Sequence, residues 1–304
     1  MSQAQLASII EGFRSLYGGW AAGAGIARMR KDWDDMFAQP RLHAELTAVQ
    51  ANGVDCRWIA APDAHADSTI VFFHGGGYQI GSLDSHHNVM ARLSGYAGCR
   101  VLGVNYRLAP EHRFPAPVDD ALAAYRWLLA QGAAPDRIAL CGDSAGGGLA
   151  VALMTLLRDK HLPMPAAAVG MSPWVDMEAA GASFIAHADS DPVTQRQTIL
   201  LMARAYLGRG GDPREPLASP IHANLARLPP LLVQAGSREV LLDDAKALVE
   251  AAKAQGVHAR LTVWPGMPHT FQLFVGRLDE ADDAIREAAG FLTDAMTQDT
   301  RKQA

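Results

Sequence analysis

The sequence has few cysteines, little net charge and no long apolar run, and each shortage excludes a class of protein. Three cysteines stand among 304 residues, too few and too scattered for a disulfide framework or a zinc site. Cys56 and Cys141 fall in apolar, strand-like runs and are expected to be buried thiols. The net charge is only −5, and no dense stripe of lysine and arginine occurs, so we expect no nucleic-acid partner.

The N-terminal region lacks the features of a signal peptide or a membrane anchor. No basic region precedes an uninterrupted apolar segment. The apolar stretch from Trp20 to Ile26 is broken by glycine and is far too short to span a bilayer. We therefore expect a cytoplasmic protein without a membrane span. A hydrophobic fraction of 49% and a charged fraction of 19% are typical of a globular chain with a sizeable core.

Strands and helices alternate along most of the chain, which predicts an α/β fold with a mostly parallel central sheet covered by helices on both faces. The expected strands are roughly 43–49, 54–60, 69–73, 101–104, 137–141, 166–171, 231–235 and 259–264. The expected helices after the N-terminal region are 118–130, 149–157, 194–207, 243–255 and 279–296. Because Asn52-Gly53 is a strong hairpin signal, the first edge of the sheet should be antiparallel.

Two segments stand outside this alternation and predict a helical cap. Residues 1 to about 40 carry an apolar stripe at helical spacing, followed by a second short helix over 26–37. Residues from about 177 to 223 follow a strand and contain no clear strand of their own. Insertions at this position commonly cover the carboxyl ends of the strands. We expect one domain over 1–304. Trp20, Met36 and Tyr78 are candidate pocket walls, with core packing as the alternative for each.

A short apolar strand leads into a helix through Gly142-Asp143-Ser144-Ala145-Gly146-Gly147. This context is the one that a nucleophile elbow requires, since the tight turn leaves no room for side chains two residues before and after the serine. Glycine occupies both positions. Ser144 is therefore predicted to be a nucleophile, and the alternative is a glycine-rich turn that happens to contain serine.

A second glycine run, His74-Gly75-Gly76-Gly77, follows a buried strand. Acyl transfer needs two or three backbone N–H groups where the carbonyl oxygen becomes an anion. We predict that Gly75, Gly76 and Ala145 supply them. His74 is expected to fix the loop rather than to carry a proton.

Serine needs a neighbouring base, and His269 is the best placed because it follows the last predicted strand. His86, His87 and His112 are alternatives, but each precedes the serine, whereas the expected order along such a chain is serine, acid, histidine. Glu239 is favoured as the acid because it lies nearer the end of a strand.

Asp243 and Asp244 compete with Glu239 for the role of the acid. A place at the start of a helix explains both without catalysis.

These motifs together resemble the hormone-sensitive-lipase-like branch of the α/β-hydrolases, a family of bacterial esterases, over residues from about 40 to 275. The family acid is usually aspartate, so Glu239 departs from the pattern in residue type. The carriers of the resemblance are His74-Gly75-Gly76-Gly77, Tyr106-Arg107-Leu108-Ala109-Pro110-Glu111, Gly142-Asp143-Ser144-Ala145-Gly146-Gly147, Asp191-Pro192 and Gly266-Met267-Pro268-His269.

The resemblance implies an α/β-hydrolase fold with a helical cap and, in many members, a homodimer formed through the last strands of the sheet. The function expected from the motifs is hydrolysis of small, short-acyl carboxylic esters through an acyl-enzyme, without metal or organic cofactor. The alternatives are a hydrolase of lactones or acetylated small molecules and a non-catalytic, receptor-like binding module.

Overall fold

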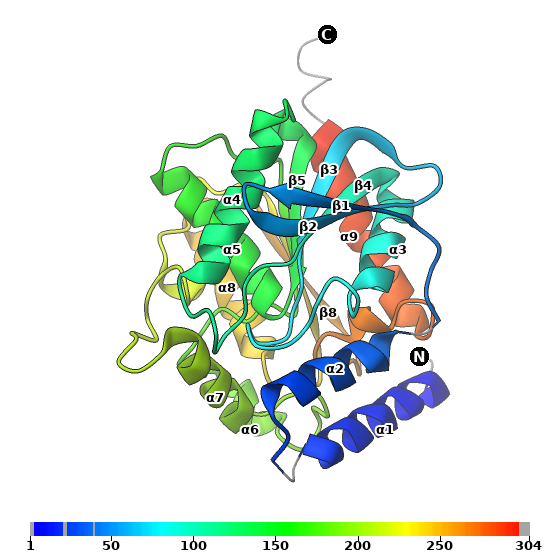
Figure 1. Ribbon diagram of the computed structural model, residues 1–304. Helices are drawn as coiled ribbons and strands as arrows, with labels where there is room; N and C mark the ends of the chain where they lie inside the picture. Colours follow the sequence, from blue (N-terminus) through cyan, green and yellow to red (C-terminus); the bar gives the residue numbers. More distant parts are fainter. Residues whose placement is uncertain (1–2, 21–22, 39, 298–304) are drawn as a thin grey trace.

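An eight-stranded sheet forms the centre of the molecule in the computed structural model, which describes residues 3–20, 23–38 and 40–297 (Figure 1). The strand order is β1-β2-β4-β3-β5-β6-β7-β8, antiparallel from β1 to β4 and parallel from there on. The strands are β1 (Glu45–Ala51), β2 (Val54–Ala60), β3 (His65–Phe73), β4 (Cys99–Val104), β5 (Ile138–Asp143), β6 (Ala168–Met171), β7 (Leu231–Gly236) and β8 (Ala259–Trp264). The predicted mostly parallel sheet is therefore confirmed, including its antiparallel edge.

The hairpin between β1 and β2 is the one that its sequence predicts. Asn52 and Gly53 both have positive φ, 52° and 87°, which is the backbone of a two-residue hairpin turn whose twist matches that of its strands. The turn sets the register, in which Ala51 pairs with Val54.

Helices cover both faces of the sheet, and the alternation of side chains along β3 shows why. Val71 and Phe73 join the core beneath α4 (Ala116–Ala130), α5 (Ala145–Asp159) and α8 (Leu242–Ala254). Ile70 and Phe72 point the other way, into the core beneath α3 (His87–Ala97) and α9 (Asp279–Thr297). Successive residues of a strand face opposite sides, so a continuous apolar strand needs a helical layer on each (Figure 1).

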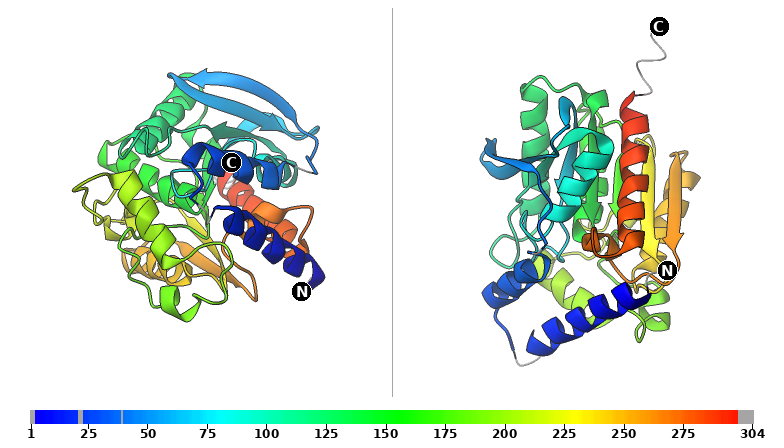
Figure 2. Two further views of the ribbon diagram at one scale, coloured as in Figure 1. Left: turned by 60° about the horizontal axis from the view of Figure 1, so that its bottom comes forward. Right: turned by 90° about the vertical axis from the view of Figure 1, so that its right-hand side faces the viewer.

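Four further helices lie together at one end of the sheet: α1 (Gln3–Trp20), α2 (Ile26–Phe37), α6 (Ser183–Ala186) and α7 (Arg196–Leu207) (Figures 1 and 2). The ring of Phe13 on α1 contacts those of Trp33 on α2 and Phe274, at centroid distances of 6.2 and 5.5 Å. Phe274 ends the short helix η3 (Phe271–Phe274). Apolar packing therefore joins the N-terminal helices to the loop region after β8.

The structure adds elements that the sequence pattern did not indicate. Helix α3 was not predicted, because its buried residues are not confined to one apolar stripe. Strand β3 starts at His65 rather than Thr69. Two shorter helices, η1 (Pro135–Arg137) and η2 (Pro220–His222), complete the described chain.

Two smaller expectations can be compared with the structure. Cys56 and Cys141 are free and buried, as predicted, and so is Cys99. None of the helices in the described part of the chain combines the length and apolar character that crossing a bilayer requires.

Candidate functional site

Ser144 lies in the tight turn between β5 and α5, with φ 48° and ψ −117°. Close packing explains the glycines around it. A Cβ on Gly142 would lie 2.4 Å from the carbonyl oxygen of Gly146, and one on Gly146 would lie 1.9 Å from that of Phe73. Only glycine fits at either position, so the local sequence forces the strained turn that presents the serine side chain.

His269 meets Ser144 across 125 residues of sequence. Its Nε2 lies 3.0 Å from Ser144 Oγ, a hydrogen-bonding distance. The histidine is presented by the loop after β8, which lies close against the end of β7. Met267 in this loop accepts a hydrogen bond from Arg238 N–H at 3.0 Å. The structure thus brings together the predicted nucleophile and base.

Glu239 is the carboxylate beside His269. Its Oε2 lies 3.8 Å from His269 Nδ1, which is longer than a hydrogen bond. The side chain is fully buried, and Oε2 accepts hydrogen bonds from Ser172 Oγ at 2.6 Å and Gly236 N–H at 3.1 Å.

The two competing aspartates are engaged elsewhere. Asp243 Oδ2 accepts from Ser183 N–H at 2.9 Å. Asp244 Oδ2 accepts from Val175 and Asp176 N–H, both at 3.2 Å. Of the three carboxylates, only Glu239 forms an ion pair with His269 within 4.0 Å.

The charges around His269 favour its protonated form. Burial of the ring opposes protonation, but the contact with Glu239 and the charges of Glu239, Asp191 and Asp143 outweigh burial and raise the pKa of His269. A nearby negative charge that stabilises imidazolium is what a base needs when it takes a proton from serine.

The glycine loop requires a correction. The N–H of Gly75 donates to Asp143 Oδ1 at 2.9 Å in a buried contact. Because this N–H already donates to Asp143, Gly75 does not fit the predicted oxyanion role in this conformation. Gly76 and Gly77 line the same cavity as Ser144, and in the described chain no hydrogen bond engages their N–H groups. The sequence did not indicate Gly77 as a candidate donor, because it does not reveal which N–H group the distant Asp143 engages.

The other histidines do not contact Ser144. His74 Nδ1 lies 2.8 Å from the carbonyl oxygen of Gly75, and its ring stacks on Tyr106 at 4.4 Å. Burial and the neighbouring His86 lower the pKa of His74 to about 3, as suits a neutral loop-fixing residue. His86 lies against Asp143, His87 contacts the carbonyl of Leu42, and His112 is exposed.

A cavity of about 650 Å³ opens above Ser144 and His269. Its walls are mainly apolar and come chiefly from α1, α2, α7 and the segment leading into α7. Trp20 is among them, whereas Met36 and Tyr78 are not. Tyr78 instead stacks on Tyr206 with centroids 3.8 Å apart. Among the wall residues are Tyr17, Trp20, Met29, Trp33, Ile199 and Met202.

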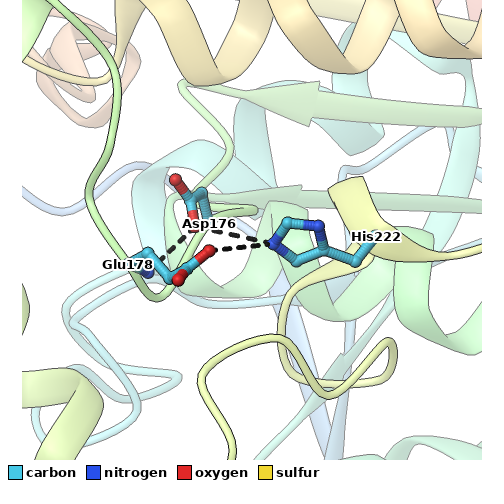
Figure 3. A group of neighbouring side chains, drawn as sticks. All are labelled: Asp176, Glu178 and His222. Atoms are coloured by element: carbon cyan, nitrogen blue, oxygen red, sulfur yellow. Dashed lines mark hydrogen bonds and ion pairs between the residues drawn. The ribbon is translucent and has the colours of Figure 1, made fainter.

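One group among the described residues has the composition to hold a metal ion: Asp176, Glu178 and His222 (Figure 3). His222 Nε2 lies 3.5 Å from Glu178 Oε2 and 4.0 Å from Asp176 Oδ1. Arg214 Nε lies 3.8 Å from Glu178 Oε2, so a cation already faces the Glu178 carboxylate. None of these side chains lines the cavity over Ser144, and we assign the group no part in the chemistry there.

Comparison with known proteins gives a consistent result. Residues 70–273 match a family defined by the α/β-hydrolase fold. An acetyl-hydrolase of Streptomyces hygroscopicus is 46% identical over 238 residues, covering 78% of this chain and 79% of that protein. An esterase of Acinetobacter venetianus is 35% identical over 230 residues, covering 76% of each.

Solved structures extend the likeness to almost the whole chain. An esterase from the bacterial hormone-sensitive lipase family is 46% identical, with a TM-score of 0.93, and the match covers 97% of this chain and 99% of that one. An esterase/lipase from an uncultured bacterium is 41% identical, with a TM-score of 0.86, over 90% of this chain and 92% of that one.

Proposed function

Since this chain belongs to the bacterial hormone-sensitive-lipase family of α/β-hydrolase-fold esterases, we propose that it hydrolyses small carboxylic esters with Ser144 as nucleophile. The observation that carries this assignment is the 3.0 Å contact between Ser144 Oγ and His269 Nε2. A receptor-like module without catalysis would have no need of a strained serine in contact with a buried histidine.

The first half of the reaction forms an acyl-enzyme. His269 Nε2 takes the proton from Ser144 Oγ as the oxygen attacks the carbonyl carbon of the ester. Glu239 stabilises the imidazolium, which requires its Oε2 to approach Nδ1 by less than 1 Å from the present 3.8 Å. Catalytic hydrogen bonds are often long in unliganded sites and tighten when substrate binds. The imidazolium then gives its proton to the leaving alcohol.

The negative charge on the carbonyl oxygen needs donors that are free to receive it. We assign Gly76 and Gly77 N–H, with Ala145 N–H, and no longer Gly75. Ala145 begins α5, so its N–H has no partner within the helix and points with the positive end of the helix dipole. The pairing of Gly75 N–H with Asp143 supports this choice.

The second half returns the enzyme to its starting state. His269 takes a proton from water, and the hydroxide attacks the acyl carbon of the Ser144 ester. The same donors hold the second oxyanion. Collapse of this intermediate releases the carboxylic acid as Ser144 Oγ regains its proton from His269. This chemistry requires no metal or organic cofactor.

The walls of the cavity support a short-acyl substrate. Trp20, Trp33 and Met202 close an apolar space of about 650 Å³ around the serine, which suits a small ester. The similarity to an acetyl-hydrolase favours acetylated small molecules as a second candidate class for the same site. Because α1, α2 and α7 supply the walls, we propose that residues 1–40 and 177–223 act as the cap.

The test is a series of p-nitrophenyl esters of increasing acyl length, assayed with the wild type and Ser144→Ala. The wild type should hydrolyse esters with acyl chains from acetate through butyrate faster than esters with longer chains. Ser144→Ala should lose about 10⁶-fold in kcat with an unchanged melting temperature. Substantial turnover by a folded Ser144→Ala protein would refute the mechanism.

A further inference from the structure

The end of β6 and the segment that follows it contact the regions that carry all three candidate catalytic residues. Met171 accepts a hydrogen bond from Ser144 N–H at 2.9 Å, and Trp174 N–H donates to the carbonyl of Ser144 at 2.9 Å. Both sides of the nucleophile turn are thereby held by this segment. Ser172 lies between these two contacts.

The hydroxyl of Ser172 joins the acid to the histidine loop. Oγ donates to Glu239 Oε2 at 2.6 Å and accepts from Thr270 N–H at 3.2 Å. Thr270 is the residue after His269. The two partners are 67 and 98 residues away in sequence, and Ser172 is fully buried. One hydroxyl thus fixes the separation between the Glu239 carboxylate and the His269 backbone.

Few other polar contacts hold the Glu239 carboxylate. Within the described chain, its Oε1 has no hydrogen-bond partner, and neither has His269 Nδ1. Oε2 is held by Ser172 Oγ and by Gly236 N–H at 3.1 Å. The distance that matters for catalysis, from this oxygen to His269 Nδ1, is 3.8 Å. Since this distance is only slightly longer than a hydrogen bond, a small displacement of the Glu239 carboxylate or of the His269 ring decides whether the bond can form.

The backbone of Ser172 also departs from what its residue type prefers. Its φ is +47°, a left-handed conformation that favours glycine. Glycine at this position would relieve strain, yet a hydroxyl-bearing residue stands there. The strained conformation is maintained by a hydrogen bond that Ser172 N–H donates to the carbonyl of Gln234 at 2.6 Å. Strained residues of this kind cluster at active sites.

We propose that Ser172 is a positioning residue whose hydroxyl holds Glu239 Oε2 where it can accept a hydrogen bond from His269 Nδ1. The inference rests on the proposed function for the role of Glu239 and His269. Ser172 lines no part of the cavity over Ser144, so it acts through these two residues and not on the substrate.

The decisive variant is Ser172→Gly, since it removes the hydroxyl and at the same time relieves the backbone. Its melting temperature should lie above that of Ser172→Ala, because both variants lose the hydroxyl but only glycine relieves the positive φ. Its kcat should fall by about 10- to 100-fold, the range for misplacing a catalytic group or losing a residue that orients one, with KM nearly unchanged. Ser172→Ala should show the same fall in kcat with a lower melting temperature.

Ser219→Ala is the matched control. Ser219 is fully buried, and its hydroxyl joins Met177 N–H to the carbonyl of Pro213, away from His269. Loss of this hydroxyl should lower the melting temperature and leave kcat unchanged. Wild-type kcat in Ser172→Gly would overturn the proposal.

A second readout does not depend on turnover. NMR titration of ¹⁵N-histidine-labelled protein measures the pKa of His269. Glu239 contributes to raising that pKa, so a displaced carboxylate should lower it in Ser172→Gly, and Ser219→Ala should leave it unchanged. If the wild type proved inactive on every ester, the proposed function would fail while this titration still decided the role of Ser172. An unchanged pKa in Ser172→Gly would contradict it.

Discussion

At the scale of single residues, we base the proposal of Glu239 among three carboxylates on the partners that each already has. Asp243 accepts from Ser183 N–H and contacts Lys246 Nζ at 3.1 Å. Asp244 is occupied by two backbone N–H groups of the 175–176 segment. Glu239 keeps one buried oxygen without a partner among the described residues and presents the other to His269. A carboxylate in that state is available to orient and stabilise an imidazolium.

We expect Glu239→Gln to lower kcat by about 10³- to 10⁴-fold, because the amide keeps the shape of the side chain but not its charge. Its melting temperature should change little. Asp243→Asn is the paired control: it should retain wild-type kcat and lose at most about 1 kcal/mol of stability at the start of α8. Steady-state kinetics and thermal unfolding of both variants decide which carboxylate is the acid. Loss of kcat in Asp243→Asn with wild-type kcat in Glu239→Gln would assign the acid to Asp243.

At the scale of elements, the cavity belongs to helices that are far apart in sequence. Trp20 closes α1, and its Nε1 donates to Asp32 Oδ2 on α2 at 3.0 Å. Ile199 and Met202 reach the same cavity from α7. Phe37 contacts Phe274 at 5.3 Å, so α2 also packs on the short helix that follows His269. The same helices therefore shape the cavity over Ser144 and support the loop that carries His269.

Trp20→Ala should widen the cavity and shift acyl preference towards longer chains. We expect the ratio of kcat/KM for hexanoate to that for acetate to rise by about 10-fold, since a methylene in an apolar pocket changes the free energy of binding by about 1–3 kcal/mol. Trp127→Ala is a fitting comparison, because Trp127 packs on Trp58 and lines no part of this cavity. An equal ratio in both variants would mean that α1 is not a wall of the substrate site.

At the scale of the whole molecule, the sheet ends in two edge strands, β1 and β8. The edge of β8 carries Val263, 38% exposed, and that of β1 carries Leu46, 42% exposed. An exposed edge strand offers unpaired backbone groups to a second chain. Homodimerisation through β8 stays a prediction from the family resemblance. A cytoplasmic location stays a prediction from the N-terminal sequence.

Val263→Lys should convert such a dimer to monomers, because a lysine on an edge strand disfavours pairing with another chain. Leu46→Lys, the equivalent change on β1, should leave the oligomeric state as it is. Sedimentation velocity of the wild type and both variants measures the outcome. A wild type that sediments as a monomer, or a dimer insensitive to Val263→Lys, would exclude pairing through β8.

Features that depend on short-range chemistry could be predicted from the residues alone. The elbow followed from glycines that must flank Ser144, the hairpin from Asn52-Gly53, and the parallel sheet from strands alternating with helices. Even the choice of His269 needed only the order of elements, because the carboxyl ends of parallel strands meet at one edge. The glycines of the elbow and the Asn52-Gly53 turn lie within a few residues of the features they specify, where sterics and hydrogen bonding leave few conformations open.

Which donors and acceptors are free and which are already paired depends on how distant segments pack together. The N–H of Gly75, predicted to be an oxyanion donor, instead donates to Asp143, which is 68 residues away in sequence. Ser172 showed no signal in the sequence, because its two partners stand 67 and 98 residues from it. The walls of the cavity are likewise formed by residues of α1 and α7, which are far apart in sequence. Such contacts are set by how whole layers pack, and since a buried donor or acceptor must find its partner wherever packing places one, local pattern cannot reveal them.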